Sequence, residues 1–427
     1  MVCRLLSVFL AIIAALIVTG CGGSEDKGGA PGEQEDTGSG SGSASEANGG
    51  ETTGGAEGGQ LTAVIPGEAV YGTSYVSPLV ELFGDVYIGE RSFVAGNTVL
   101  RAAPDRRLDI GSETNAQDNI IVRSLENSST IGNETSLVHH AIVRDSTVGD
   151  FAFLGFDAEI IDSTIEDGAL ISAGALIENV TIPEDALVSP GAQITTQEQT
   201  DALEKVTEAN EEFKREVLDV NAEFAENYIT LYEEEGYDAV IGVGPNPVTS
   251  FNAERVEPQT NDAEVGEFVR IVGNVRLGSG SRVGERAAIR ADEGSPITIG
   301  EDAEIEERVT FHALKYTNIE VGDNLTVGDY SVIHGPIEIG DSLTVGDDSV
   351  VFRVRVGDDV VIGDGVTIQG TASEDGELEL EIPDGTNIPD GAVVTNQEEL
   401  DAIIEQQGQQ QGQGKEKEKG KENEKKK

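Results

Sequence analysis

Aliphatic residues recur every six positions over most of the chain. The longest run takes every sixth residue from Val321 to Val351, and the first half shows the same spacing from Ile88 to Leu100 and from Ile131 to Val143. An α-helix does not suit this period, because 3.6 residues per turn would scatter these side chains around its surface. A coil of three short strands does suit it, with one inward aliphatic residue per strand and a small residue at each corner. The pattern therefore predicts stacked β-coils.

The six-residue pattern occurs twice, and the two halves resemble each other. Arg101-Ala102-Ala103 matches Arg290-Ala291-Asp292 at an offset of 189 residues (290 − 101), and Leu137–Arg144 matches Val327–His334 at an offset of 190 (327 − 137). We therefore predict a mainly β fold with two left-handed parallel β-helix domains. A helical region should follow the first domain, and a short helix should follow the second.

The domain boundaries follow from where the period stops. Between Thr196 and Glu235 the sequence is rich in Glu, Ala and Leu, and Thr196 is a plausible helix N-cap. The predicted segments are a signal peptide (1–20), a Gly/Ser/Glu tether (21–60), β-helix domain 1 (61–200), a helical segment (201–243), β-helix domain 2 (244–405) and a Gln/Gly/Lys tail (406–427).

The N-terminus has the features of an export signal. Arg4 precedes an apolar run from Leu5 to Val18, and Val18-Thr19-Gly20-Cys21 resembles a bacterial-type lipobox. The resemblance implies cleavage before Cys21 and acylation of its thiol; an uncleaved anchor is the alternative. Either way, we expect the body to lie outside the cytoplasmic membrane, at the cell surface or in the periplasm.

Composition and charge exclude several classes of function. Glycine is abundant at 53 residues and tryptophan is absent, which disfavours a helical bundle. The net charge of −52 excludes sequence-independent nucleic-acid binding and leaves a lipid anchor as the expected membrane contact. The acidic surplus suits a halophilic protein that works in high salt. Cys3 and Cys21 both lie near the N-terminus, so a metal in the folded body needs His, Asp or Glu ligands.

Several motifs resemble the γ-class carbonic anhydrases. Three lie in the second half, namely Arg290–Gly294, His312-Ala313-Leu314 and His334-Gly335-Pro336. The others are Asn115–Asn119, Ser136–His139, Asn246–Asn252, and Val220 to Tyr228, which resembles the family's C-terminal helix. The resemblance covers most of residues 61–404. It implies reversible hydration of carbon dioxide to bicarbonate.

The resemblance also implies a metal site at an interface. The family binds each Zn²⁺ with three histidines, two from one β-helix and one from its neighbour in a trimer. Domain 2 has His312 and His334 at the two same-subunit positions but Asp329 at the donated position. In domain 1 the same-subunit positions hold Arg123 and Arg144.

Domain 1 supplies the histidine that domain 2 lacks, because its donated position is His139. We therefore expect His139, His312 and His334 to form one metal site shared by the two domain types. The opposite pairing would place Asp329 between Arg123 and Arg144 as a salt bridge at a structural interface. Zn²⁺ is the expected metal, and three imidazoles also accept Fe²⁺ or Co²⁺.

The resemblance assigns further roles around the metal. Glu293 matches a carboxylate that relays protons, whereas Lys315 stands where some members have a second one. Gln117 matches a glutamine beside the metal, for which domain 2 has Glu306. Asn221 matches an active-site asparagine of the C-terminal helix.

Two arginines match an interface position of the family. These are Arg101 and Arg290, of which only Arg290 has its acidic companion, Asp292. We expect the remaining histidine, His140, to be an exposed bystander, because it points to the strand face opposite its neighbour His139.

Three functions remain open at this point. They are a carbonic anhydrase, a non-catalytic structural or assembly protein that kept the fold, and a hexapeptide acyltransferase, which would need a cleft for a pantetheine chain. The resemblance predicts a homo-oligomer with trimer-like packing. Two domain types cannot alternate around a ring with an odd number of β-helices. Trimer-like packing would therefore require either two stacked rings built from three chains or a partner subunit.

Overall fold

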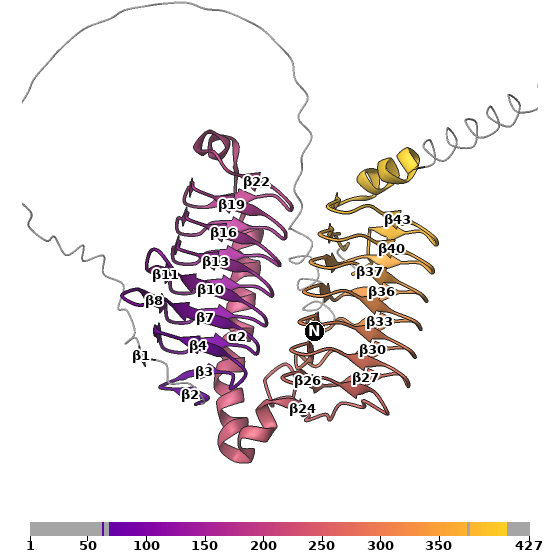
Figure 1. Ribbon diagram of the computed structural model, residues 1–427, viewed down its shortest axis with the longest axis horizontal. Helices are drawn as coiled ribbons and strands as arrows, with labels where there is room; N and C mark the ends of the chain where they lie inside the picture. The colour runs from indigo at the N-terminus through magenta and orange to yellow at the C-terminus, as the bar shows by residue number, and fades with distance from the viewer. Residues whose placement is uncertain (1–61, 64–67, 374–375, 408–427) are drawn as a thin grey trace, which may run out of the picture.

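The computed structural model describes residues 62–63, 68–373 and 376–407. It contains two parallel β-helices that lie side by side, as the six-residue period predicts (Figure 1). The expected signal peptide, Cys21, the tether and the tail beyond residue 407 lie outside the described residues. Among the described helices, none has the length and apolar character needed to cross a membrane.

Domain 1 has three sheets. The first contains β1 (Thr62–Ala63), β5 (Asp85–Ile88), β8 (Arg107–Ile110), β11 (Ser129–Ile131), β14 (Thr147–Val148), β17 (Thr164–Ile165) and β20 (Thr181–Ile182). The second contains β4 (Glu81–Phe83), β7 (Val99–Ala102), β10 (Ile121–Ser124), β13 (Ile142–Arg144), β16 (Glu159–Ile161), β19 (Leu176–Glu178) and β22 (Gln193–Ile194). The third contains β2 (Val70–Tyr71), β3 (Ser74–Val76), β6 (Phe93–Val94), β9 (Asn115–Ala116), β12 (Ser136–Leu137), β15 (Phe153–Leu154), β18 (Leu170–Ile171), β21 (Ala186–Val188) and β23 (Glu204–Lys205).

Domain 2 repeats this plan. One sheet contains β24 (Gly242–Gly244), β26 (Arg270–Gly273), β29 (Ala288–Ala291), β32 (Thr310–His312), β35 (Val332–His334), β38 (Val350–Phe352), β41 (Thr367–Gln369) and β44 (Val393–Val394). The next contains β25 (Glu264–Val265), β28 (Arg282–Val283), β31 (Glu304–Ile305), β34 (Thr326–Val327), β37 (Thr344–Val345), β40 (Val361–Ile362) and β43 (Asn387–Ile388). The last contains β27 (Val275–Leu277), β30 (Ile297–Ile299), β33 (Ile319–Val321), β36 (Ile337–Ile339), β39 (Arg355–Val356) and β42 (Glu381–Ile382).

The periodic aliphatic residues form the interior column of each stack. Val327, Ile333 and Val351 are fully buried in the column of domain 2, and Leu137 and Val143 are fully buried in that of domain 1. Each column is built from its own domain alone. The period of six therefore fixes which side chains point inward, and the residues between them are free to carry other chemistry.

The outer corners of domain 2 are joined by aspartate side chains. Oδ1 of Asp341 accepts a bond from the backbone N–H of Asp323 at 2.8 Å, and Asp358 does the same for Asp341 at 2.9 Å. The residue before each aspartate is glycine, because a Cβ at Gly340 would lie 2.3 Å from Oδ1 of Asp358. Part of the acidic surplus therefore holds successive coils together.

The segment between the domains is less continuous than the sequence predicts. Thr196 caps only the short 3₁₀ helix η1 (Gln197–Ala202), and the chain then adds β23 to domain 1. The long helix α2 (Glu208–Glu235) begins at a second cap, Thr207, whose hydroxyl accepts a bond from the Asn210 N–H. A further 3₁₀ turn, η2 (Tyr237–Val240), leads into domain 2. Residues 397–407 form the expected short terminal helix.

Helix α2 lies along the third sheet of domain 1 (Figure 1). Phe224 and Tyr228 pack against Tyr75 and Phe93 of that sheet, with ring centroids 5.1 to 5.7 Å apart. At its N-terminal end Lys214 donates to two corner carbonyl groups of the β-helix. The helix therefore covers domain 1 on the side that faces the site described below.

Corner residues of the two domains meet in register. Asn97 donates to the carbonyl oxygen of Arg286 at 2.8 Å, and one coil higher Asn119 donates to the hydroxyl of Thr310 at 3.0 Å. In return, Arg308 donates to the carbonyl oxygen of Asn97 at 3.0 Å. The pairs 97/286 and 119/308 are equivalent positions of the two halves, so this contact joins like corners coil by coil.

One level of this contact brings two acidic side chains together. Burial raises the pKa of Asp157 well above its usual value, and the charge of Asp348 raises it further. The pKa of Asp348 is also raised, by burial and by neighbouring aspartates. The pKa of Asp157 is higher in the folded than in the unfolded chain. Its contribution to the stability of the folded state is therefore favourable at low pH and is lost as the pH rises through the folded pKa.

We predict that Asp157→Asn stabilises the protein at pH 8, by about 1 kcal/mol, the usual scale of a point substitution. Asparagine removes the charge and tolerates the positive φ of 53° at this corner. Chemical denaturation of both proteins at pH 4 and pH 8 checks this. The gain in the free energy of unfolding should shrink at pH 4, where the carboxyl group of the wild type is protonated. If Asp157→Asn lowered the free energy of unfolding equally at both pH values, the account would be contradicted.

Candidate metal centre

His312 and His334 lie at the ends of two neighbouring strands. Strands β32 and β35 pair in parallel, with His312 directly opposite His334. Each histidine follows an inward apolar residue, Phe311 or Ile333, so its ring points out of the coil. Both rings are nonetheless buried, at 4% and 3% exposure, because domain 1 covers this face.

The third histidine comes from domain 1. His139 follows β12 at the corner that faces domain 2, and its ring is completely buried. One ligand atom from each of His139, His312 and His334 lies within 4.8 Å of the others. Nε2 of His139 is 3.1 Å from Nδ1 of His312, and Nδ1 of His334 donates to the carbonyl oxygen of Gly335 at 3.0 Å. One chain therefore gathers all three rings from its two domains.

Burial keeps the three imidazoles neutral. It lowers the pKa of His334 to about 3, and it lowers those of His139 and His312 well below the usual value, with neighbouring positive charge adding to the effect. Nδ1 of His139 and Nε2 of His312 are buried without a hydrogen-bond partner. Because one nitrogen of each neutral ring lies within 4.8 Å of a nitrogen of each of the other two, the three imidazoles fit a divalent cation such as Zn²⁺.

A buried ion-pair network holds the two domains together beside the histidines. Arg290 of β29 donates to Oδ2 of Asp118 in domain 1 at 2.6 Å and to Oδ2 of Asp292 at 2.9 and 3.0 Å. The hydroxyl of Tyr228 on α2 donates to the same oxygen of Asp292 at 2.6 Å. Asp118 Oδ2 also lies 3.5 Å from Nδ1 of His139, so the carboxylate that pairs with Arg290 lies beside the donated histidine as well.

The charges in this network depend on one another. Burial alone would lower the pKa of Arg290, but Asp118 and Asp292 raise it well above its usual value. Burial raises the pKa of Asp118, and Arg290 opposes that rise. The guanidinium group therefore stays charged between two acids that would otherwise be costly to bury.

Glu293 lies next to the histidine cluster. Its Oε1 is 3.4 Å from Nε2 of His312, and its Oε2 accepts a bond from the backbone N–H of Lys315 at 2.8 Å. Burial raises the pKa of Glu293 to about 7. A carboxyl group with this pKa can take up and release protons near neutral pH.

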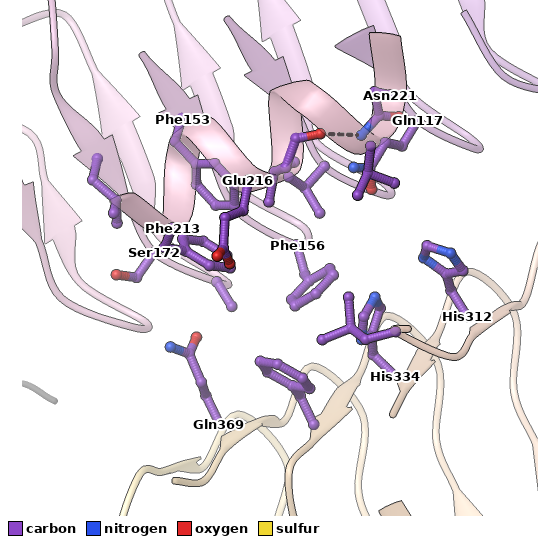
Figure 2. A pocket seen from close by; sticks show the side chains of 18 of the residues that line it. Gln117, Phe153, Phe156, Ser172, Phe213, Glu216, Asn221, His312, His334 and Gln369 are labelled. Atoms are coloured by element: carbon purple, nitrogen blue, oxygen red, sulfur yellow. Dashed lines mark hydrogen bonds between the residues drawn. The ribbon is translucent and has the colours of Figure 1, made fainter. Parts of the chain in front are cut away.

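A largely apolar pocket, whose lining includes four phenylalanines, opens onto the cluster from the side of α2 (Figure 2). Phe156 lies at its centre, parallel to the ring of His139 with centroids 6.1 Å apart and 4.7 Å from that of His334. The polar lining includes Gln117, Asn221 and Glu216. Asn221 donates to the carbonyl oxygen of Val217 one turn earlier on α2. The pocket can admit a small, weakly polar molecule.

The arginines of domain 1 and Asp329 of domain 2 are not brought together within the chain. Arg101 and Arg123 are exposed on domain 1, and Arg144 pairs with Asp162 at 3.3 Å. Asp329 lies on domain 2, where it accepts a bond from the backbone N–H of Glu307. The salt bridge of Asp329 with the two arginines therefore stays a prediction for contacts between chains.

The expectation for His140 is wrong. Its side chain is buried, at 4% exposure, and makes a contact with domain 2: Nε2 lies 2.9 Å from the hydroxyl oxygen of Thr310. The residue has a positive φ of 69°, so it sits at the corner rather than continuing the strand. Alternation along a strand does not apply at that position.

The sequence reasoning also missed residues that complete the site. Asp118 was part of a matched motif but received no role, although its counterpart at an offset of 189 is the acidic Glu307. Phe156 and Glu216 carried no signal in the six-residue pattern. They belong to the site through packing between the domains and α2, which a period along the chain does not describe.

Curated relatives include both enzymes and assembly proteins. The chain is 29% identical over 188 residues to the carbonic anhydrase of Methanosarcina thermophila, which covers 39% of this chain and 72% of that protein. It is 29% and 33% identical to the carboxysome assembly proteins CcmM of Nostoc and Synechococcus elongatus, over 38% and 34% of this chain. Those matches span only 30% and 27% of the two CcmM proteins. No family model matches the chain.

A hexapeptide transferase family protein from Anaplasma phagocytophilum is 22% identical, covering 36% of this chain and 91% of that one, with a TM-score of 0.30. The six-residue repeats and the parallel sheets of the two stacks define the class: a hexapeptide-repeat β-helix protein. Within that class, the chain is similar to carbonic anhydrases and to CcmM proteins.

We predict that Arg290→Met lowers the free energy of unfolding by about 3–5 kcal/mol at pH 7, because it leaves two buried carboxylates without their partner. Chemical denaturation provides the measurement. Arg276→Met, at an exposed position on β27, is the matched control and should change the free energy of unfolding little. A loss no larger than that of the control would show that the network does not hold the domains together.

Proposed function

We propose that the chain is a carbonic anhydrase that reversibly hydrates carbon dioxide at a metal site shared by its two domains. The convergence of three buried, neutral imidazoles from His139, His312 and His334 carries this proposal. These three neutral ligands would hold a cation such as Zn²⁺ without compensating its charge, and such a metal would supply the acidity that activates water at neutral pH. The similarity to a carbonic anhydrase supports the same reaction.

The surrounding residues suit this chemistry. The aromatic wall around Phe156 favours a small apolar substrate such as carbon dioxide over bulk water. Asp118 lies beside the His139 ring, and Gln117 and Asn221 offer amide groups to bicarbonate. Glu293 accepts the proton released when water is consumed.

A structural role is the second candidate. The CcmM relatives are named for carboxysome assembly. In addition, domain 1 carries Arg123 and Arg144 at the positions where domain 2 has His312 and His334. An acyltransferase has less support, because three of the four histidines converge on one another and the fourth, His140, is buried against Thr310 at the contact between the domains. We also propose that the chain carries a lipid anchor at Cys21 and lies outside the cytoplasmic membrane.

Metal content and carbon dioxide hydration, measured on the same samples, test the proposal. We expect about one metal ion per chain with activity in the wild type, and the loss of both in His139→Ala, because two imidazoles hold the metal far more weakly than three. The control is His140→Asn, which changes the neighbouring histidine at a corner that asparagine tolerates, and should keep both properties.

Two outcomes would contradict the proposal. A folded wild type that stays free of metal and inactive after Zn²⁺, Fe²⁺ or Co²⁺ is supplied favours the structural role. Full metal retention in His139→Ala would show that the two domains do not share the site.

We predict that Glu293→Gln lowers kcat for hydration by about 10²-fold or more, the usual scale for loss of a positioned general base. The metal content should not change, because glutamine keeps the size of the side chain and Glu293 is not one of the three ligands. Turnover measured at low and high imidazole buffer concentration provides the check. Buffer should restore part of the rate if Glu293 moves protons, and should restore none if the substitution only distorts the site.

A further inference from the structure

A proton released at the histidine cluster cannot pass from Glu293 straight into bulk solvent. Glu293 is only 5% exposed. Its Oε1 lies 3.4 Å from Nε2 of His312, and its Oε2 accepts the backbone N–H of Lys315 at 2.8 Å. The proton must therefore travel through the pocket that Glu293 lines.

The pocket has room for water between Glu293 and helix α2. It encloses about 80 Å³ and is lined on one side by α2 (Figure 2). A water molecule needs roughly 10–15 Å³ of cavity space, so several fit. Hydrogen-bonded water carries protons between groups that are too far apart to touch. Such a route needs a group at its outer end that both accepts and releases protons.

Few side chains of the pocket meet this requirement. The titratable residues that line it are Glu216, Glu293, His312, Lys315 and His334. The two histidines belong to the cluster, and the charged ammonium group of Lys315 has no lone pair with which to accept a proton. Apart from Glu293, this leaves Glu216.

Glu216 lies between the pocket and solvent. It belongs to α2, and its side chain points from the helix into the pocket (Figure 2). The residue is half-buried, whereas Glu293 is almost completely buried. The carboxylate of Glu216 is therefore within reach of water on both sides.

The charges around Glu216 suit a group that exchanges protons. Burial raises its pKa, the positive charge of Lys315 from domain 2 opposes that rise, and Glu212 and Asp219 on α2 add to it. A carboxylate with a raised pKa takes up a proton more readily near neutral pH than an ordinary one. The charge of Lys315 at the same time favours the ionised form, which is the form that accepts a proton.

We propose that Glu216 carries protons between the pocket and bulk solvent, an inference that rests on the proposed hydration of carbon dioxide. In each turnover the O–H bond of the Glu293 carboxyl group breaks, the proton passes through water in the pocket, and an O–H bond forms on the carboxylate of Glu216. Glu216 then gives the proton to a buffer base in solution, and both carboxylates return to their ionised state. Helix α2 thus takes part in the reaction as well as in the packing of domain 1.

The kinetics of Glu216→Gln test this inference. At low buffer concentration we expect kcat for hydration to fall by about 10²-fold, the lower end of the usual range for a proton-transfer group. The value of kcat/KM should not change, because proton release follows the conversion of carbon dioxide. A high imidazole concentration should restore kcat, since imidazole then takes up the proton. Glu216→Asp keeps the carboxylate and should retain most of kcat.

A second measurement does not depend on turnover. In carbon NMR spectra of the protein as purified, the carboxyl signal that disappears in Glu216→Gln belongs to Glu216, and its titration gives the pKa. That pKa should lie above the usual value and rise further in Lys315→Met, because the substitution removes the positive charge that lowers it. A pKa that does not respond to Lys315→Met would overturn the placement of Glu216 at the pocket.

The controls separate proton transfer from folding and from the metal site. Glu226→Gln makes the same change in charge at an exposed position elsewhere on α2 and should keep kcat. Metal content should be equal in all variants, since none of them changes a histidine of the cluster. An active wild type whose kcat survives Glu216→Gln at low buffer concentration, or a loss that imidazole does not restore, overturns this inference alone. A metal-loaded wild type without activity overturns the proposed function and this inference with it.

Discussion

The geometry of the histidine cluster depends on the contact between the corner of domain 1 that carries His139 and the sheet of domain 2 that carries His312 and His334. His139 lies on one β-helix and its two partners on the other, so the cluster exists only while the coils stay in register. Arg290 sets that register, because its guanidinium group binds a carboxylate from each domain. Buried charge is costly, and the network is stable because every charge in it has a partner.

The same fold supports both the site and its duplication. A period of six commits one residue in each short strand to the interior and leaves the outward positions free to differ between the halves. Domain 2 uses these positions for Arg290, His312 and His334, whereas domain 1 has arginine at all three. The two halves have therefore become complementary rather than redundant: one lends a histidine and the other receives it.

Much of this could be predicted from the sequence, and the remainder has a physical explanation. The six-residue period alone places Val327 and Ile333 in the core, because each coil repeats the same local pattern. The three clustered histidines follow from the family resemblance together with the offset between the two halves. The break in the helical segment was missed because Thr196 and Thr207 offer equally good caps, and the added strand β23 decides between them. Asp118 and His140 were misread because their partners lie in the other domain, which no local pattern reveals.

X-ray absorption spectroscopy at the K-edge of the bound metal, on the purified wild-type chain, tests the central claim most directly. A shared site predicts three imidazole nitrogens at about 2.0–2.1 Å for zinc, with the imidazole scattering pattern reduced to two in His139→Ala. A first shell made only of oxygen atoms, or one that is unchanged in His139→Ala, would contradict a metal centre assembled from both domains.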